Sequence, residues 1–219
     1  MPFSTSMMDQ ATPLHAARLN YVLRHLKASG ARRVLDLGCG GGWLLHELLS
    51  DDQFTEVVGL ESSAAALAEA RAMLAADLDA PAPRLRLLNA SYLDYHPALA
   101  GFDAATMVET IEHIPPGQLS RMEQAVFGTL APATLIVTTP NAEYNPLYGL
   151  APGQFREADH KFEWSRDKFR QWARGVAGRN GYRVAFGGIG DADMELGPPS
   201  QVAFFRLTAA IRQGRFYDQ

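Results

Sequence analysis

The sequence has almost no cysteine: Cys39 is the only one among 219 residues. A single cysteine cannot form an intramolecular disulfide, which excludes the small secreted scaffolds that disulfides stabilise and favours a reducing compartment. No uncharged run approaches the roughly 18 apolar residues that would span a bilayer. The first ten residues, MPFSTSMMDQ, also lack the basic stretch and apolar core of a secretory signal. The sequence therefore predicts a cytoplasmic protein without a membrane-spanning segment.

Positive charge is not in excess either. Lys and Arg number 20 and Asp and Glu number 24, which gives a formal charge of −4. This balance argues against a protein devoted entirely to binding polyanions, although a local basic face could still bind nucleic acid. Because 47% of the residues are hydrophobic, the chain can form one well-buried domain. We expect a single domain over residues 1–219, with residues 1–11 as a flexible extension.

Strand-like and helix-like segments alternate along the chain. Short apolar runs predict strands, and amphipathic or alanine-rich segments predict helices. The predicted strands span residues 32–39, 56–62, 84–91, 102–109, 134–140, 182–190 and 201–209; the predicted helices span 13–29, 43–50, 63–78 and 119–130, and a last one begins after Ser165. Between residues 141 and 164 we expect a long loop. This order predicts an α/β fold with a mostly parallel seven-stranded sheet, helices on both faces and a final antiparallel hairpin, and ligand sites at the carboxyl ends of the strands.

A glycine-rich loop follows the first predicted strand, in VLDLGCGGG. Its glycines are Gly38, Gly40, Gly41 and Gly42. Residues without side chains let the backbone approach a ligand closely, and four of them exceed what a tight turn requires. Glu61 ends the second predicted strand about 20 residues later, where a carboxylate can accept hydrogen bonds from both ribose hydroxyls. Dinucleotide-binding dehydrogenases share this plan, but Trp43 directly follows the last glycine, so the spacing departs from GxGxxG.

The VLDLGCGGG loop resembles the first motif of the class I S-adenosylmethionine-dependent methyltransferases, whose Rossmann-like sheet also ends in an antiparallel hairpin. The resemblance implies that S-adenosylmethionine is the cofactor. It also implies that Asp36 and the glycine loop contact the methionine portion, that Glu61 binds the ribose, and that Ser91 and Tyr92 lie beside the adenine. From the residues alone, ordinary packing explains Tyr92 equally well.

Three metal-ligand residue types lie close together in MVETIEHIPP: Glu109, Glu112 and His113. If a helical turn begins at Glu109, all three share one face, because residues i, i+3 and i+4 do. The alternative is a helix start with acidic residues near its positive end and a histidine on the surface. His160, in ADHKFEWS, is either a fourth ligand or a loop histidine packed among aromatic residues.

Together with TPNAEYN after the fifth predicted strand, these stretches resemble the small-RNA 3′-end ribose 2′-O-methyltransferases of the Hen type, over roughly residues 14–207. The resemblance implies that Glu109, Glu112, His113 and His160 are the catalytic residues and bind a divalent metal at the 2′- and 3′-hydroxyls of the terminal nucleotide. A bound cation lowers the pKa of a hydroxyl and orients it. Two imidazoles beside two carboxylates suit Mn²⁺ better than Mg²⁺, although the ligand types do not decide between them.

Residues 161–183 carry seven Lys or Arg against two acidic residues. Such a run is usually a solvated helix face. Because it follows His160, it could instead contact RNA phosphates, with Tyr144, Tyr148 and Phe155 available to stack on end nucleotides. The expected partner is an RNA 3′ end, and the protein could act alone or with a protein of a small-RNA or RNA-repair pathway.

Two other hypotheses stay open. O-methyltransferases of catechols or quinone precursors can also carry an acidic-x-x-Glu-His segment and chelate vicinal hydroxyls, but they have less need of a second distant histidine or a basic segment. The last hypothesis is a cofactor-binding scaffold that stabilises a partner enzyme. The intact Asp36, Glu61 and four metal-ligand candidates argue against it.

Overall fold

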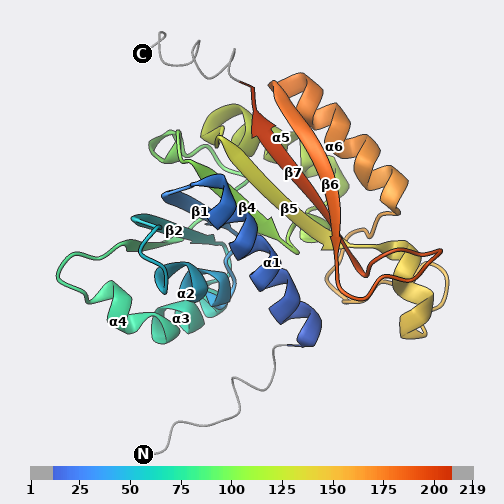
Figure 1. The fold of residues 1–219 in the computed structure, drawn as a ribbon, viewed down its shortest axis with the longest axis horizontal. Coiled ribbons are helices and arrows are strands. Elements are labelled where there is room, and N and C mark those ends of the chain that lie inside the picture. The colour runs from blue at the N-terminus through green and yellow to red at the C-terminus, as the bar shows by residue number, and fades with distance from the viewer. Residues whose placement is uncertain (1–11, 209–219) are drawn as a thin grey trace, which may run out of the picture.

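A seven-stranded sheet forms the centre of the molecule, and helices cover both of its faces (Figure 1). The computed structural model describes residues 12–208. The strand order is β3-β2-β1-β4-β5-β7-β6, and only β7 runs antiparallel to its neighbours. The strands are β1 (Arg33–Leu37), β2 (Glu56–Glu61), β3 (Leu85–Asn89), β4 (Ala104–Val108), β5 (Thr134–Pro140), β6 (Tyr182–Ile189) and β7 (Ser200–Leu207). The predicted mostly parallel sheet with a final antiparallel hairpin is confirmed.

The helices begin and end at residues that favour such ends. They are α1 (Pro13–Ser29), α2 (Trp43–Leu49), α3 (Ala64–Met73), α4 (Ala75–Leu78), α5 (Leu119–Glu123) and α6 (Arg166–Asn180). The side chains of Thr12, Ser63 and Ser165 accept hydrogen bonds from backbone N–H groups in the first turns of α1, α3 and α6. Both α1 and α6 end at a glycine in the left-handed conformation, Gly30 and Gly181. Among residues 12–208, no helix combines the length and apolar character needed to cross a bilayer.

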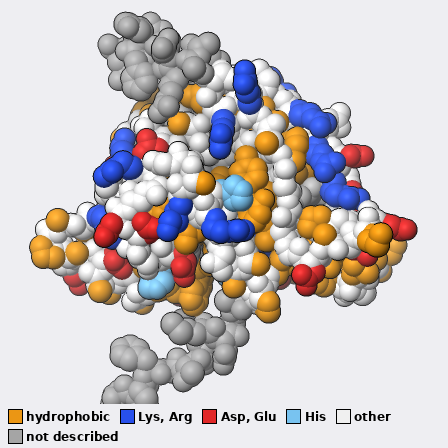
Figure 2. All heavy atoms as spheres, viewed as in Figure 1, with side chains coloured by type: hydrophobic (Ala, Val, Ile, Leu, Met, Phe, Trp, Pro, Cys, Tyr) orange, Lys and Arg blue, Asp and Glu red, His pale blue; other side chains and the backbone are white. Residues whose placement is uncertain are grey.

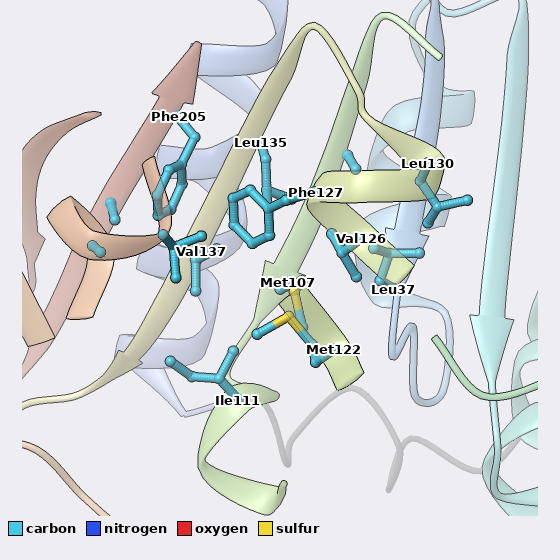
Figure 3. Packing of buried hydrophobic residues seen from close by; sticks show 14 of the residues in the cluster. Leu37, Met107, Ile111, Met122, Val126, Phe127, Leu130, Leu135, Val137 and Phe205 are labelled. Atoms are coloured by element: carbon cyan, nitrogen blue, oxygen red, sulfur yellow. The ribbon is translucent and has the colours of Figure 1, made fainter. Parts of the chain in front are cut away.

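Two hydrophobic clusters pack against the two faces of the sheet. Helices α1, α2 and α3 cover one face, and α5, the π-helix Gln124–Leu130 and α6 cover the other. In the second cluster, the rings of Phe127 and Phe205 meet edge to face with centroids 4.9 Å apart (Figure 3). Both side chains are fully buried, and burying such a side chain contributes about 1.5–3 kcal/mol. This packing fixes the strands whose carboxyl ends carry the candidate site.

The structure differs from the sequence-based prediction in three segments. The predicted helix 63–78 is interrupted at Leu74, which separates α3 from α4. The predicted helix 119–130 widens into the π-helix after Glu123 and ends at Ala131, which has a positive φ of 43°. The long loop after Pro140 contains the 3₁₀-helix Ala142–Tyr148, because the side chain of Asn141 caps its first turn. The predicted flexible extension at residues 1–11 lies outside the described residues.

Candidate active site

The glycine loop, Glu61 and the 109–113 segment meet at one edge of the sheet, because β1, β2 and β4 are parallel neighbours and end there. In the glycine loop, the backbone N–H groups of Gly38 and Cys39 both donate to the carbonyl oxygen of Leu60, at 2.8 and 3.0 Å. Gly38 has a φ of 83°, and a Cβ there would lie 2.6 Å from Cγ2 of Thr110. A side chain at this position is therefore excluded both by the backbone conformation and by the neighbouring segment.

Two carboxylates line the glycine loop. Glu61 accepts the backbone N–H of Gly40 through Oε2 at 3.0 Å and that of Ser63 through Oε1 at 2.7 Å. Asp36 is 3% exposed and accepts the Thr106 hydroxyl at 2.8 Å. Burial raises the pKa of Asp36 to about 7, and the charge of Glu61 adds to the rise while the Thr106 hydrogen bond opposes it. A cationic group beside Asp36 would favour the ionised form of its carboxyl group. The side of the loop formed by Asp36 and Glu61 therefore fits a ligand with positive charge.

Tyr92 lies against the glycine loop, because its ring is the second contact, at 3.4 Å, of a Cβ built on Gly38. Its hydroxyl donates to the carbonyl oxygen of Thr110 at 3.4 Å. Burial raises the pKa of Tyr92 to about 12, with the charges of Glu112 and Glu61 adding to the rise. Ser91 instead shapes its own turn, where its hydroxyl accepts the N–H of Leu93. Tyr92 therefore lies beside the glycine loop, and the Ser91 hydroxyl accepts a hydrogen bond within its own turn.

Glu112, His113 and His160 form a cluster whose three candidate ligand atoms lie within 4.8 Å of one another. The imidazole rings of His113 and His160 are edge to face with centroids 4.9 Å apart. The backbone N–H of Lys161 donates to the carbonyl oxygen of Glu112 at 2.7 Å, which joins the two segments. His160 is buried, and it lies beside Glu112 and a second histidine. The alternative of a packed loop histidine therefore does not remove it from the site.

The carboxylate of Glu112 is placed to accept a cation. The residue is 0% exposed, and its Oε2 accepts the Thr139 hydroxyl at 2.9 Å. Its Oε1 is buried and has no hydrogen-bond partner among the described residues. Burial and then the charge of Glu109 raise the pKa of Glu112 well above its ordinary value. An unpaired buried oxygen beside two imidazoles fits a divalent cation, and this donor set suits Mn²⁺ or Mg²⁺.

Glu109 does not begin a helical turn. It has a φ of 52°, and the 3₁₀-helix begins two residues later, at Ile111. The condition under which Glu109, Glu112 and His113 would share one helix face is therefore not met, and Glu109 is not one of the three clustered residues. Its Oε2 lies 3.1 Å from Nη2 of Arg18, and its buried Oε1 has no hydrogen-bond partner among the described residues. Burial raises the pKa of Glu109, and the charges of Arg18 and His160 oppose this rise.

Several residues at the site were not predicted from the sequence. Arg18 reaches Glu109 from α1, and its Nε donates to the Ser200 hydroxyl at 2.8 Å. Thr139 and Glu163 hold Glu112 and His160 through hydrogen bonds. Glu163 could have been noticed as an acidic residue three positions after a candidate ligand. No sequence signal identifies Arg18, because only the packing of α1 brings it to the site.

Five of the seven cations of the basic segment lie on α6, and four of these five are exposed. Figure 2 shows Lys and Arg side chains gathered over that helix. Arg166 and Arg179 form ion pairs with Glu143 and Glu123, at 2.6 and 2.8 Å. The others on the helix lie over aromatic rings: Lys168 over Trp164, and Arg170 and Arg174 over Phe186. Aromatic side chains are also exposed on the loop that precedes His160, at Tyr148 and Phe155.

Comparisons with known proteins agree with this geometry. The methyltransferase domain family matches residues 34–133. The crystal structure of the methyltransferase domain of bacterial CtHen1 has a TM-score of 0.80 and 39% identity, and the match covers 89% of this chain and 100% of that one. The small RNA 2′-O-methyltransferase of Arabidopsis thaliana is 34% identical over 216 residues, which are 90% of this chain but 23% of the relative. The Xenopus tropicalis protein of that name is 36% identical over 88% of this chain and 54% of its own length.

The chain therefore spans about a quarter of the first of these relatives and about half of the second, and it matches the bacterial domain from end to end. It shares with that domain both the fold and more than a third of its residues. The chain belongs to the Hen1-type small-RNA 2′-O-methyltransferase family, within the class I S-adenosylmethionine-dependent methyltransferases.

Proposed function

We propose that this protein transfers the methyl group of S-adenosylmethionine to the 2′-hydroxyl of the 3′-terminal nucleotide of an RNA, with the help of a divalent cation. The methyl–sulfur bond of the sulfonium breaks, a methyl–oxygen bond forms at O2′, and the hydroxyl proton leaves. The observation that carries the proposal is the cluster of Glu112, His113 and His160, in which the carboxylate of Glu112 keeps one buried oxygen, Oε1, without a hydrogen-bond partner among the described residues. This cluster adjoins the acid-lined glycine loop, because the ring of Tyr92 lies against Gly38 and its hydroxyl donates to the carbonyl oxygen of Thr110, two residues before Glu112.

In this proposal the residues divide into two groups. Asp36, Gly38, Gly40, Gly41, Glu61, Ser91 and Tyr92 bind the cofactor. Glu109, Glu112, His113 and His160 bind the cation. Both oxygens of Glu61 already accept backbone N–H groups, and the remaining lone pairs of the carboxylate are available to ribose hydroxyls. The carboxylate of Asp36 would face a positively charged part of the cofactor, which favours its ionised form.

The residues that bind the cation act mainly by positioning the RNA hydroxyl. When bound, a divalent cation lowers the pKa of the ribose hydroxyl and fixes its direction. The Lys161 N–H group holds the backbone carbonyl of Glu112, and the Thr139 hydroxyl holds one oxygen of its carboxylate. Well-oriented model reactions gain up to about 7–11 kcal/mol from such positioning. Glu109 completes the proposed set if it exchanges its ion pair with Arg18 for the cation.

The substrate class rests on the family and on the surface. Relatives of this chain carry the name small RNA 2′-O-methyltransferase. The exposed cations on α6 and the exposed aromatic residues before His160 suit RNA phosphates and bases. We further propose that residues 1–219 act as one cytoplasmic domain, and that a protein of a small-RNA or RNA-repair pathway is its partner.

Methyl-labelled cofactor tests the proposal directly. The protein is incubated with Mn²⁺ and one of three acceptors: a short RNA, the same RNA with a 2′-deoxy terminal sugar, or a catechol. We expect label only in the unmodified RNA, and we expect the labelled RNA end to resist periodate, which requires a free vicinal diol. Labelling of the 2′-deoxy RNA would contradict the position of the methyl group. Labelling of the catechol alone would contradict the RNA substrate.

A further inference from the structure

Glu163 contacts one of the two ring nitrogens of His160. Its side chain is 0% exposed, and its Oε1 is 2.6 Å from Nδ1 of His160. The two residues are three positions apart in the loop that leads into α6. A buried carboxylate in contact with the second nitrogen of a candidate ligand is an arrangement that commonly orients metal-binding imidazoles.

The carboxylate of Glu163 is itself held in place. Its Oε1 also accepts the backbone N–H of Arg156 at 2.7 Å, and its Oε2 accepts the side-chain amide of Asn145 at 2.6 Å. The guanidinium of Arg156 in turn donates to the carbonyl oxygens of Asn141 and Pro199, at 2.6 and 2.9 Å. Glu163 is therefore tied to the end of β5 and to the hairpin, and it cannot follow His160 if that ring rotates.

This contact decides which nitrogen of His160 is free. Because both Glu163 oxygens accept hydrogen bonds from N–H groups, the carboxylate acts as an acceptor and Nδ1 must be the donor. A neutral imidazole that donates through Nδ1 keeps its lone pair on Nε2. Since Nδ1 is occupied by Glu163, Nε2 is the nitrogen left to face Glu112 and His113.

We infer that Glu163 is a positioning residue of the metal site, which orients His160 so that Nε2 presents its lone pair to the cation. The inference rests on the proposed function. The neighbouring imidazole has a weaker support of the same kind: Nδ1 of His113 is 3.0 Å from Oδ2 of Asp159, and these side chains are 38% and 70% exposed. Water competes for that contact, so Asp159 holds His113 less firmly than Glu163 holds His160.

Mn²⁺ binding to the full chain, measured by calorimetry and by pulsed electron paramagnetic resonance, tests the inference without any turnover. Glu163→Gln nearly preserves the shape of the side chain but can offer its amide N–H to Nδ1, which favours the tautomer with a proton on Nε2. We expect it to weaken Mn²⁺ binding about 10–100-fold, the usual effect of losing an outer partner of a ligand. The nitrogen coupling from one imidazole should also disappear from the spectrum. Asp159→Asn should weaken binding no more than about fivefold, because its contact is exposed.

Two controls separate orientation from folding. Glu123→Gln is a matched substitution at a half-buried glutamate that also accepts hydrogen bonds from an arginine and an asparagine, but on α5; it should leave Mn²⁺ binding unchanged. Asn145→Ala removes the contact on Oε2 and loosens the loop without touching Nδ1 of His160. If Asn145→Ala and Glu163→Gln lower both the melting temperature and the Mn²⁺ affinity equally, Glu163 only holds the loop and the inference is overturned.

The outcomes distinguish this inference from the proposed function. Wild-type protein that binds Mn²⁺ with two imidazole nitrogens, together with unchanged binding in Glu163→Gln, would overturn the role of Glu163 and leave the metal site standing. Wild-type protein that binds no Mn²⁺ would overturn the metal-dependent function, and the role of Glu163 with it. Weaker Mn²⁺ binding by Glu163→Gln, together with the loss of one nitrogen coupling, supports both the metal site and the role of Glu163.

Discussion

Thr139 donates its hydroxyl to Oε2 of Glu112 at 2.9 Å, and neither side chain reaches solvent. The bond connects the end of β5 to the turn after β4 and fixes one oxygen of a carboxylate whose other oxygen is unpaired. We expect Thr139→Val, which keeps the shape but removes the donor, to lower the free energy of unfolding by about 1–3 kcal/mol. Thr139→Ser keeps the donor and should therefore retain most of this stabilisation. Urea unfolding of the three proteins measures the difference, and equal midpoints for wild type and Thr139→Val would show that the bond contributes nothing.

Removal of the buried imidazole should affect the reaction rather than cofactor binding. His160 belongs to the Glu112 cluster and makes no hydrogen bond to the glycine loop among the described residues. We expect His160→Ala to slow RNA methylation at least about 10²-fold, because a misplaced acceptor loses the benefit of orientation, while the Kd for S-adenosylmethionine stays the same. The exposed His46 on α2 supplies the control, His46→Ala, whose rate should match wild type. A comparable loss of cofactor affinity in His160→Ala would argue against a metal ligand.

The buried Asp36 should make the cofactor-free protein less stable as the pH rises. Its pKa is raised to about 7 in the folded protein, so the folded state keeps a proton that the unfolded chain releases near pH 4. The free energy of unfolding therefore falls between about pH 4 and pH 7, by up to about 4 kcal/mol from this group, and is level above that range. Asp36→Asn should remove this part of the decrease. Urea unfolding of wild type and Asp36→Asn at pH 5 and pH 8 measures this decrease. An identical pH dependence in the two proteins would contradict the raised pKa of Asp36.

Local signals predicted most of the fold and much of the site. Apolar periodicity and capping residues such as Thr12 and Ser165 act within a few positions, so the strands and the helix starts follow from the sequence. The conformation of Glu109 could not be predicted in this way, since a φ of 52° depends on the contacts around the turn. The same holds for Arg18, because its ion pair with Glu109 requires α1 to pack across the sheet. Contacts between distant segments carry no local pattern.

The glycine loop should tolerate a methyl group differently at two of its positions. Gly40 has a φ of 52° and open space around its Cβ position, so Gly40→Ala should cost only the backbone strain, about 1–2 kcal/mol. Gly38→Ala adds an overlap with Cγ2 of Thr110 at 2.6 Å and should destabilise the protein more. Thr110→Ser removes that methyl group, so the double variant should recover part of the loss. Denaturant unfolding of Gly40→Ala, Gly38→Ala, Thr110→Ser and the double variant measures these differences. A double variant no more stable than Gly38→Ala would show that the overlap is relieved elsewhere.

The cations on α6 should give RNA binding its dependence on salt. Arg170 and Arg174 lie over the ring of Phe186 on an exposed helix face, whereas Arg166 and Arg179 are held in ion pairs. If Arg170 and Arg174 contact phosphates, losing each of them should reduce the magnitude of the slope of log affinity against log salt by about 0.7 for single-stranded RNA. The double variant Arg170→Gln with Arg174→Gln should thus weaken binding most at low salt and reduce the magnitude of the slope by about 1.4.

A matched loss of charge elsewhere decides whether α6 is the RNA-binding surface. Arg86 lies on β3, at the opposite edge of the sheet from β6, and pairs with Glu56 at 2.7 Å. Arg86→Gln removes one positive charge, so it changes the overall field of the protein but no contact near the candidate site. Fluorescence anisotropy with a labelled RNA over a range of salt concentrations should give wild-type slope for Arg86→Gln. If instead each substitution lowers the slope by the same amount per charge, the attraction comes from the protein as a whole and α6 has no specific role.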